Sequence, residues 1–259
     1  MLTKPDICKA FTDRFDRMVC LNLAERTDRR TNILRQFRSL GIDGHVEFHT
    51  AVKHPHSQAI MDGLNKSGKG CFTKPNEFSC AREHYTIIKK AYLQNVEHLL
   101  IFEDDVLFMK DFEYIVNTLK NMPDGWQCCQ FGGFTVDEKV FEKSIRHDSG
   151  YWMQGIPVWN MSMVALGREA MRQYISMQDY QMNVADFAPY IWNNQTPGAI
   201  VKTLPNSLTR QTWLTTRPVV IQNLNVESDI RGWDLNIRNT NINAYEAWIK
   251  AEDYGPGGN

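Results

Sequence analysis

The sequence lacks the segments that would carry it into or across a membrane. Its N-terminal stretch, MLTKPDICKAFTDRFDR, contains no continuous apolar run of the kind found in signal peptides. No stretch approaches the run of about 18 apolar residues that a transmembrane helix needs. We therefore expect a cytoplasmic protein, which could also associate peripherally with the inner face of the membrane.

An excess of charge of one sign is also missing. The chain of 259 residues has 29 basic and 30 acidic side chains, a formal net charge of −1. General nucleic-acid binding leaves a basic footprint, and none is present here, although a local basic groove would not alter this balance.

Cysteine pairs and internal repeats are absent as well. The six cysteines are dispersed, and none forms the Cys-x-x-Cys pair of a zinc site. A chain of this size can bury a sizeable core without disulfides, so we expect reduced thiols. With no low-complexity linker, residues 1–259 are predicted to form a single domain.

Strand-like and helix-like segments alternate along the chain. We expect strands at 17–25, 45–52, 98–106 and 126–134, and helices at 27–41, 73–95 and 110–121. The second half predicts a strand at 159–167, a helix at 168–177 and a strand entering a polar loop at 218–234. Residues 53–72 are expected to form a loop. This alternation favours an α/β fold with a layered sheet.

Three consecutive acids end the most strand-like segment, LLIFEDDVLF at 99–108. Side chains alternate along a strand, so Glu103 and Asp105 should share one side and Asp104 the other. In an open α/β sheet, ligands collect at the carboxyl ends of the strands. Two carboxylates on one side suit a hard divalent cation such as Mg²⁺ or Mn²⁺, which leaves coordination positions for substrate phosphates.

A structural explanation of the same acids is equally open. They could cap the following helix, or pair with nearby arginine and lysine side chains. The acidic stretch alone does not distinguish the two explanations.

Four blocks, taken in order, resemble glycosyltransferase family 25. The first is LNLAERTDRR (21–30), and the second is NEFSCAREHYTII (76–88), which lacks the glycines and the serine of the family pattern. The third, LIFEDDVLF (100–108), is nearly intact, and the fourth is the SDI at 228–230.

The resemblance implies a GT-A type fold, with a Rossmann-like mixed sheet flanked by helices. Residues of about 17–135 would bind a nucleotide sugar, and residues of about 150–250 the acceptor. It implies a metal-dependent inverting hexosyltransferase that uses Mn²⁺ or Mg²⁺ and a nucleoside-diphosphate sugar, with UDP as the expected nucleotide. The acceptor would be a glycan or glycolipid, as in lipopolysaccharide biosynthesis.

Metal ligands are expected in the acidic block. Asp105 is the first choice, with Glu103 and Asp229 as further ligands. Glu103 could instead contact the ribose, and Asp104 could do either. A purely structural role for at least one of the three acids at 103–105 is an equally open alternative.

The first block supplies candidates for binding the nucleotide sugar. They are Asn22, Arg26, Asp28 and Arg30. A guanidinium at the start of a helix could bind diphosphate oxygens in a bidentate manner, with Asp28 orienting it. We favour this role for Arg26, and a surface position for at least one of Arg29 and Arg30.

The second block places Glu77, Cys80 and His84 along one line of a helix. Glu77 and His84 are candidates for contacting the donor, although His84 could equally be a core histidine. As a metal site the three residues are unconvincing, because no fourth ligand is evident.

Asp186 is the candidate general base, since the resemblance implies a late aspartate near the acceptor. Its aromatic neighbours Phe187, Tyr190 and Trp192 could stack on a sugar ring, or belong to the core.

Two alternatives to a transferase that acts on glycans remain open. One is a non-catalytic sugar-nucleotide or carbohydrate-binding protein. The other is a transferase that acts on a hydroxylated nucleic-acid base.

Overall fold

The computed structural model describes residues 2–70, 72–133, 144–155, 158–159, 161–193, 208 and 211–222. The helices are α1 (Lys4–Thr12), α2 (Thr27–Leu40), α3 (Ser57–Lys66), α4 (Pro75–Leu93), α5 (Phe112–Lys120), α6 (Arg168–Tyr180) and α7 (Phe187–Asn193). The strands are β1 (Arg17–Leu23), β2 (Val46–Ala51), β3 (His98–Glu103), β4 (Val106–Phe108), β5 (Cys128–Gln130), β6 (Ile145–Arg146), β7 (Trp152–Gln154), β8 (Met163–Gly167), β9 (Thr212–Thr215) and β10 (Val220–Gln222).

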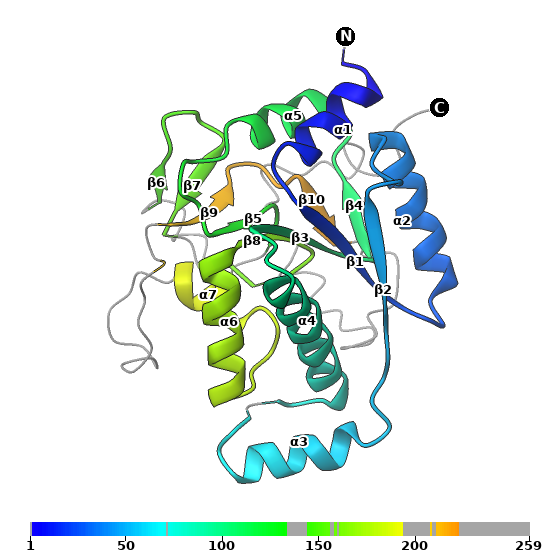
Figure 1. Cartoon of the computed structure of the whole chain (residues 1–259), viewed down its shortest axis with the longest axis vertical. Helices are drawn as coiled ribbons and strands as arrows, with labels where there is room; N and C mark the ends of the chain where they lie inside the picture. Colours follow the sequence, from blue (N-terminus) through cyan, green and yellow to red (C-terminus); the bar gives the residue numbers. More distant parts are fainter. Residues whose placement is uncertain are drawn as a thin grey trace.

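Eight of these strands form one mixed sheet in the order β2-β1-β3-β8-β5-β9-β7-β6 (Figure 1). β1 pairs in parallel with both β2 and β3, and β8 runs antiparallel between β3 and β5. The parallel strands β1, β2 and β3 therefore end at one edge of the sheet. The predicted mixed α/β fold of Rossmann-like type is confirmed.

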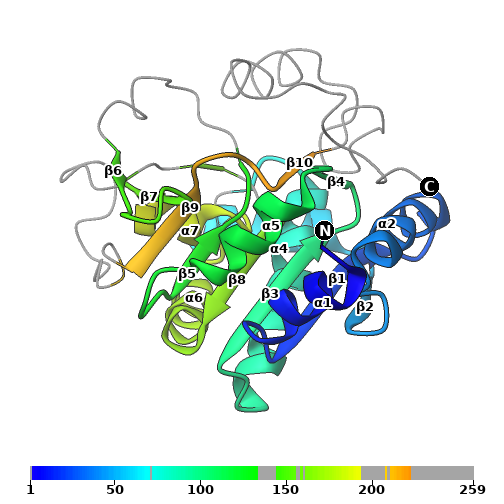
Figure 2. The same ribbon diagram turned by 90° about the horizontal axis from the view of Figure 1, so that it is seen from above.

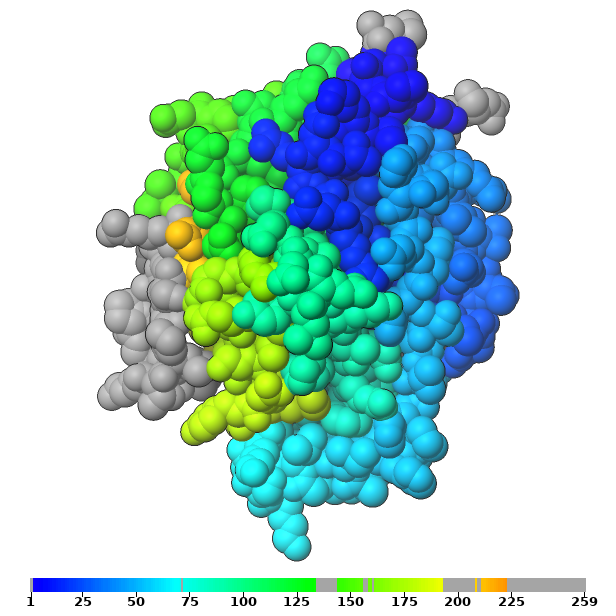
Figure 3. Space-filling view, viewed as in Figure 1, coloured from blue at the N-terminus to red at the C-terminus, as the bar shows by residue number. Residues whose placement is uncertain are grey.

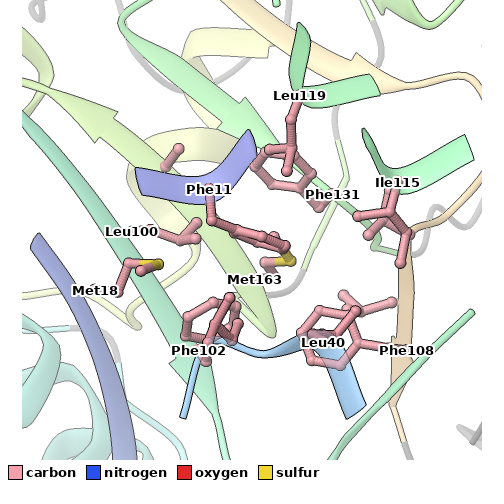
Figure 4. Packing of buried hydrophobic residues seen from close by; sticks show 14 of the residues in the cluster. Phe11, Met18, Leu40, Leu100, Phe102, Phe108, Ile115, Leu119, Phe131 and Met163 are labelled. Atoms are coloured by element: carbon pink, nitrogen blue, oxygen red, sulfur yellow. The ribbon is translucent and has the colours of Figure 1, made fainter. Parts of the chain in front are cut away.

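Helices cover both faces of this sheet. On one face, α1, α2 and α5 contribute Phe11, Phe37 and Ile115 to an apolar core. Phe102 of β3 and Phe131, just after β5, belong to the same core (Figure 4). Figure 2 shows α1 beside α5 on this face.

The other face is covered by α4, α6 and α7. These helices bury Ile88, Tyr174 and Trp192 against alternate residues of the same strands, such as Leu99 and Ile101. The surfaces of α4 and α6 adjoin in Figure 3, with α3 below them. Alternation along the strands thus supplies two apolar layers, one for each group of helices.

Several local predictions hold, because they rest on strong signals. Helix α2 ends at Gly41, whose φ of 75° is a left-handed conformation that glycine adopts readily. Helix α4 has its proline in the first turn, as expected.

Two local predictions are wrong. Residues 53–72 are not all loop, since α3 occupies Ser57–Lys66, with Met61 buried. The strand expected at 98–106 ends at Glu103, and a turn at Asp104 and Asp105 leads into β4.

Two further features complete the fold. Helix α1, which we did not expect, starts with a capping box between Thr3 and Asp6. Among the described residues, no helix is both long and apolar enough to cross a membrane.

Candidate functional site

The three acids lie at the carboxyl end of β3, beside the carboxyl end of β1. Glu103 is the last residue of β3 and pairs with Leu21 of β1. Asp104 and Asp105 form the turn that follows. Strand alternation therefore stops at Glu103. The prediction that Asp104 points away from the other two acids fails, because both aspartates contact one arginine.

That arginine is Arg29, in the first turn of α2. Its Nη1 lies 3.1 Å from Oδ1 of Asp104 and 3.4 Å from Oδ2 of Asp105. Only 6% of Arg29 is exposed. The surface position that we expected for at least one of Arg29 and Arg30 does not apply to Arg29. The structural explanation, pairing with a nearby arginine, holds for these two aspartates.

Asn22 completes the surroundings of Asp104. Its Nδ2 donates to Oδ2 of Asp104 at 2.6 Å and to the carbonyl oxygen of Arg26 at 3.2 Å. Burial raises the pKa of Asp104, and the neighbouring Asp105 raises it further, whereas the hydrogen bonds from Asn22 and Arg29 lower it. Both oxygens of Asp104 are thus occupied by the protein itself.

Asp105 is only partly satisfied. Its Oδ2 also accepts a hydrogen bond of 3.1 Å from Gln222 of β10. Its Oδ1 is buried and has no hydrogen-bond partner among the described residues. A buried carboxylate oxygen without a partner is costly unless a cation or a donor group binds to it.

Glu103 faces the opposite way, toward α4. Its Oε1 lies 3.6 Å from Nε2 of His84. Burial raises the pKa of Glu103 well above its usual range, and the charges of Asp105, Asp186 and Asp104 add to the shift. The half-buried Asp186, just before α7, is therefore close enough to act on Glu103. The structure thus brings Asp186 near Glu103, although the two residues are far apart in the sequence.

His84 is fully buried on α4. Its Nδ1 lies 3.0 Å from the carbonyl oxygen of Cys80, and its Nε2 has no hydrogen-bond partner among the described residues. Burial lowers the pKa of His84 to about 4, so the ring is neutral at physiological pH. The Sγ of Cys80 lies 3.6 Å from Nδ1 of His84.

Glu77, on the same line of α4, has a different environment. Its Oε2 accepts hydrogen bonds from the backbone N–H groups of Thr73 (2.8 Å) and Lys74 (3.2 Å). It therefore caps the start of the helix, and it is not among the residues that line the pocket described below.

The remaining first-block residues lie around the start of α2. Arg26 and Asp28 form a two-pronged ion pair, with N–O distances of 3.0 Å and 2.9 Å. The hydrogen bonds from Arg26 lower the pKa of Asp28 to about 2. Arg30 is half-buried, and its guanidinium lies 4.0 Å over the ring of Phe48.

A pocket opens in front of these acids. It encloses about 670 Å³, part of it open to solvent. Its apolar wall comes from the ends of β1 and β2 and the residue after β2, and its polar wall from α2, α4, the acidic turn and β10. The lining residues are Leu21, Leu23, Arg29, Ala51, Val52, Lys53, Asn76, Ser79, Cys80, Glu83, Glu103, Asp104, Asp105 and Gln222.

Sequence reasoning did not assign several polar residues of this pocket, among them Glu83, Gln222 and Arg29. Glu83 is buried on α4, and its Oε2 lies 2.6 Å from Nε2 of His49 on β2. Gln222 reaches Asp105 from a strand more than 100 positions away. Arg29 belonged to the arginine-rich start of α2, but Arg26 was favoured for binding and a surface position was expected for at least one of Arg29 and Arg30. Only the i, i+7 spacing of Asn76 and Glu83 on α4 could have indicated the first of these.

The expected acceptor aromatics differ in their exposure. Trp192 is 1% exposed and belongs to the core, and Phe187 packs against the same cluster. Tyr190 stacks on Trp159 with ring centroids 4.0 Å apart and planes 15° apart. Asp229, the further metal ligand that we expected, lies outside the described residues.

Comparison with known proteins finds distant relatives. The chain is 23% identical over 192 residues to the human protein named inactive glycosyltransferase 25 family member 3, covering 69% of this chain and 32% of that protein. It is 29% identical over 154 residues to a glycosyltransferase 25 family member of Anopheles gambiae, covering 52% of this chain and 26% of that protein. The chain thus spans about a third or less of these relatives.

A comparison with protein-family models gives the same family. Residues 16–143 match the model of glycosyltransferase family 25, described as lipopolysaccharide biosynthesis protein. The match includes β1, α2, α4 and the acidic turn, and hence most of the lining of the pocket. The resemblance read from the four sequence blocks is confirmed, and residues 16–143 form a domain of glycosyltransferase family 25.

Proposed function

We propose that this protein is a metal-dependent inverting glycosyltransferase. It would transfer a hexose from a nucleoside-diphosphate sugar, expected to be UDP-linked, to a hydroxyl group of a glycan or glycolipid. The observation that carries the proposal is Asp105, whose buried Oδ1 has no hydrogen-bond partner among the described residues and which lines a pocket at the carboxyl ends of β1 and β3.

The charge balance of the pocket fits a divalent cation. Glu103, Asp104 and Asp105 lie near the guanidinium of Arg29, whose one positive charge neutralises at most one of them. Carboxylate oxygens are the ligands that Mn²⁺ and Mg²⁺ prefer. We assign the cation to Asp105, and the nearby charge of Glu103, which faces α4, adds to its attraction. When bound, it would neutralise the diphosphate and stabilise it as the leaving group.

The walls of the pocket suit the rest of a nucleotide sugar. Leu21, Leu23 and Val52 offer an apolar surface to the base, and Asn76 and Glu83 offer hydrogen-bonding groups to the nucleoside. Arg26, held in a fixed orientation by Asp28, is the proposed ligand of the diphosphate. Asn22 and Asp104 would support this arrangement by holding Arg29 and the Arg26 backbone.

Asp186 is the proposed general base. It would accept the proton of the acceptor hydroxyl while that oxygen attacks the anomeric carbon. The new glycosidic bond would form as the bond to the diphosphate oxygen breaks, which inverts the configuration. The half-buried position of Asp186 near Glu103 supports this role, because a base must lie within reach of the reacting centre.

The experiment is a panel of nucleotide sugars offered to the purified chain with and without Mn²⁺, with nucleotide release as the readout. We expect release with one donor class and no release in EDTA. Asp105→Asn should lower the rate at least about 100-fold, as expected when charge stabilisation of the leaving group is lost. Asp124→Asn, at an exposed position after α5, is the matched control. Unchanged release in Asp105→Asn would contradict the assignment.

A second function, binding a sugar nucleotide without transfer, has its own support. Arg29 already occupies Asp104 and contacts Asp105, and the human and Bos taurus relatives carry names that call them inactive or probably inactive. This function predicts that a nucleotide sugar raises the melting temperature of the chain in Mn²⁺, whereas no acceptor or water releases the nucleotide.

A further inference from the structure

A sulfur, a nitrogen and an oxygen atom that can bind metals lie close together beside the pocket, two of them on α4 and one on β3. Cys80 and His84 are four positions apart on α4, so their side chains share one face of the helix. That face meets the end of β3 at Glu103. The Sγ of Cys80, a ring nitrogen of His84 and a carboxylate oxygen of Glu103 all lie within 4.8 Å of one another.

The imidazole of His84 is already oriented as in many metal sites. Its Nδ1 lies 3.0 Å from the carbonyl oxygen of Cys80 and can only donate to it, so the neutral ring carries its lone pair on Nε2. Histidines that bind metals commonly donate the other ring N–H to a backbone carbonyl in this way. Nε2 points toward Glu103 rather than toward solvent, since His84 is 0% exposed.

The separation between Nε2 of His84 and Oε1 of Glu103 is not that of a hydrogen bond. At 3.6 Å it is too long for a hydrogen bond. Zinc bonds to nitrogen and oxygen are about 2.0–2.1 Å long, which places two ligand atoms of a tetrahedral site about 3.4 Å apart. The gap thus has the width of an ion bound by both groups.

We propose that Cys80, His84 and Glu103 bind a zinc-class ion, at a site separate from the oxygen-ligand site of Asp105. A sulfur, a nitrogen and an oxygen ligand suit Zn²⁺ or Co²⁺, whereas Mn²⁺ and Mg²⁺ favour oxygen ligands. Cys80 and Glu103 both line the pocket, which gives the ion a path of entry and leaves its fourth position open to solvent.

The sequence made Glu77, Cys80 and His84 unconvincing as a metal site because no fourth ligand was evident, and the structure brings a different third residue, Glu103, to Cys80 and His84. Sequence spacing placed Glu77 on their line of α4, but Glu77 caps the helix. The missing ligand comes from β3, which the fold sets against this face of α4. An ion here would hold Glu103 toward α4, whether or not the protein transfers a sugar.

The test uses the metal alone and a chain without a histidine tag. The protein is stripped with a chelator, dialysed and titrated with Co²⁺. We expect one equivalent to bind, with the visible absorption of tetrahedral cobalt and a near-ultraviolet band from thiolate ligation, and Zn²⁺ should displace it. Absence of saturable Zn²⁺ binding would overturn the proposal.

Two variants test the ligands, and a third serves as the control. Cys80→Ser should remove the thiolate band and weaken Zn²⁺ binding at least about 100-fold, since even outer-shell partners of a metal site are worth about 10–100-fold. Glu103→Gln should weaken it as well. Cys8→Ser, a half-buried cysteine on α1 in the opposite helix layer, is the matched control and should bind as the wild type does.

Folding of the variants is checked separately. His84→Gln could disturb the core, so its melting curve without metal is recorded beside its Zn²⁺ affinity. Cys80 is only half-buried, and Cys80→Ser carries the decision on its own. A Cys80→Ser protein that keeps the thiolate band and the Zn²⁺ affinity would exclude the site. Because nucleotide release is not read, failure of the transferase proposal would not affect this result.

Discussion

The carboxylates on the two sides of the acidic turn have different contacts. On the α2 side, Arg29 and Asn22 make ion pairs and hydrogen bonds with Asp104, and Arg29 also contacts Asp105. On the α4 side, Glu103 faces the uncharged ring of His84 across 3.6 Å, with the acids Asp105 and Asp186 nearby.

This difference separates structure from chemistry within one short sequence block. On the α2 side, an internal salt bridge holds the acidic turn and α2 together. On the α4 side, burial and the charges of Asp105 and Asp186 raise the pKa of Glu103, and Nε2 of His84 has no hydrogen-bond partner among the described residues. A cation would therefore have its largest effect there.

Replacing Arg29 should have the largest effect on stability. Arg29→Met leaves Asp104 and Asp105 buried without their shared cation. Removal of one partner of a buried ion pair costs about 3–5 kcal/mol. Urea unfolding in EDTA measures the change. Mn²⁺ should recover part of the loss if a metal can bind the same acids. Arg35→Met, exposed on the same helix, is the control, and an equal loss there would contradict the role of Arg29.

Glu103 should make the protein less stable as pH rises. Because its pKa is raised in the folded state, folding favours the protonated form. Its contribution is complete below pH 4.5, the usual value, and is lost as pH rises toward the folded-state pKa. Each pH unit in this window costs about 1.4 kcal/mol. Glu103→Gln in EDTA should remove this slope from the unfolding free energy. An unchanged slope would show that Glu103 is not the cause.

The sequence was sufficient for the part of the fold that local patterns determine. The apolar run of β3, the helical spacing of Ile33, Phe37 and Leu40 in α2, and Gly41 at its end are all local signals. The short strands β6, β7 and β9 could not be predicted, because each is only two to four residues long and depends on its partners in the sheet.

The sequence predicted which segments contribute to the site, but not which of their residues are in contact. The acidic block and the Arg-rich start of α2 were both identified, yet the sequence could not show that Arg29, rather than Arg26, contacts the aspartates. That choice depends on the turn at Asp104, which ends the strand alternation. The partner of Cys80 and His84 was also hidden, because Glu103 meets them only through the packing of α4 on β3.

Removing Asn22 should have a smaller effect than removing Arg29. Asn22→Ala takes one hydrogen bond from Asp104 and one from the carbonyl oxygen of Arg26, while Arg29 stays in place. Loss of a hydrogen bond to a buried charged group costs about 1.5–3 kcal/mol. Urea unfolding again gives the value, with Asn117→Ala on α5 as control. A loss as large as that of Arg29→Met would mean that Asn22 and not Arg29 is the main support of Asp104.

The smallest effect is expected at Asp28, on the α2 side but in solvent. Its pKa is lowered by hydrogen bonds from Arg26, so its contribution is present above pH 3.8 and is lost as pH falls toward about 2. The Asp28 side chain is 60% exposed, and exposed pairs contribute about 0–1 kcal/mol. Asp28→Asn should therefore change the urea midpoint little at pH 7, with Asp124→Asn as control. A large change would mean that the Arg26–Asp28 pair, rather than the buried contacts of Arg29, holds the start of α2 against the acidic turn.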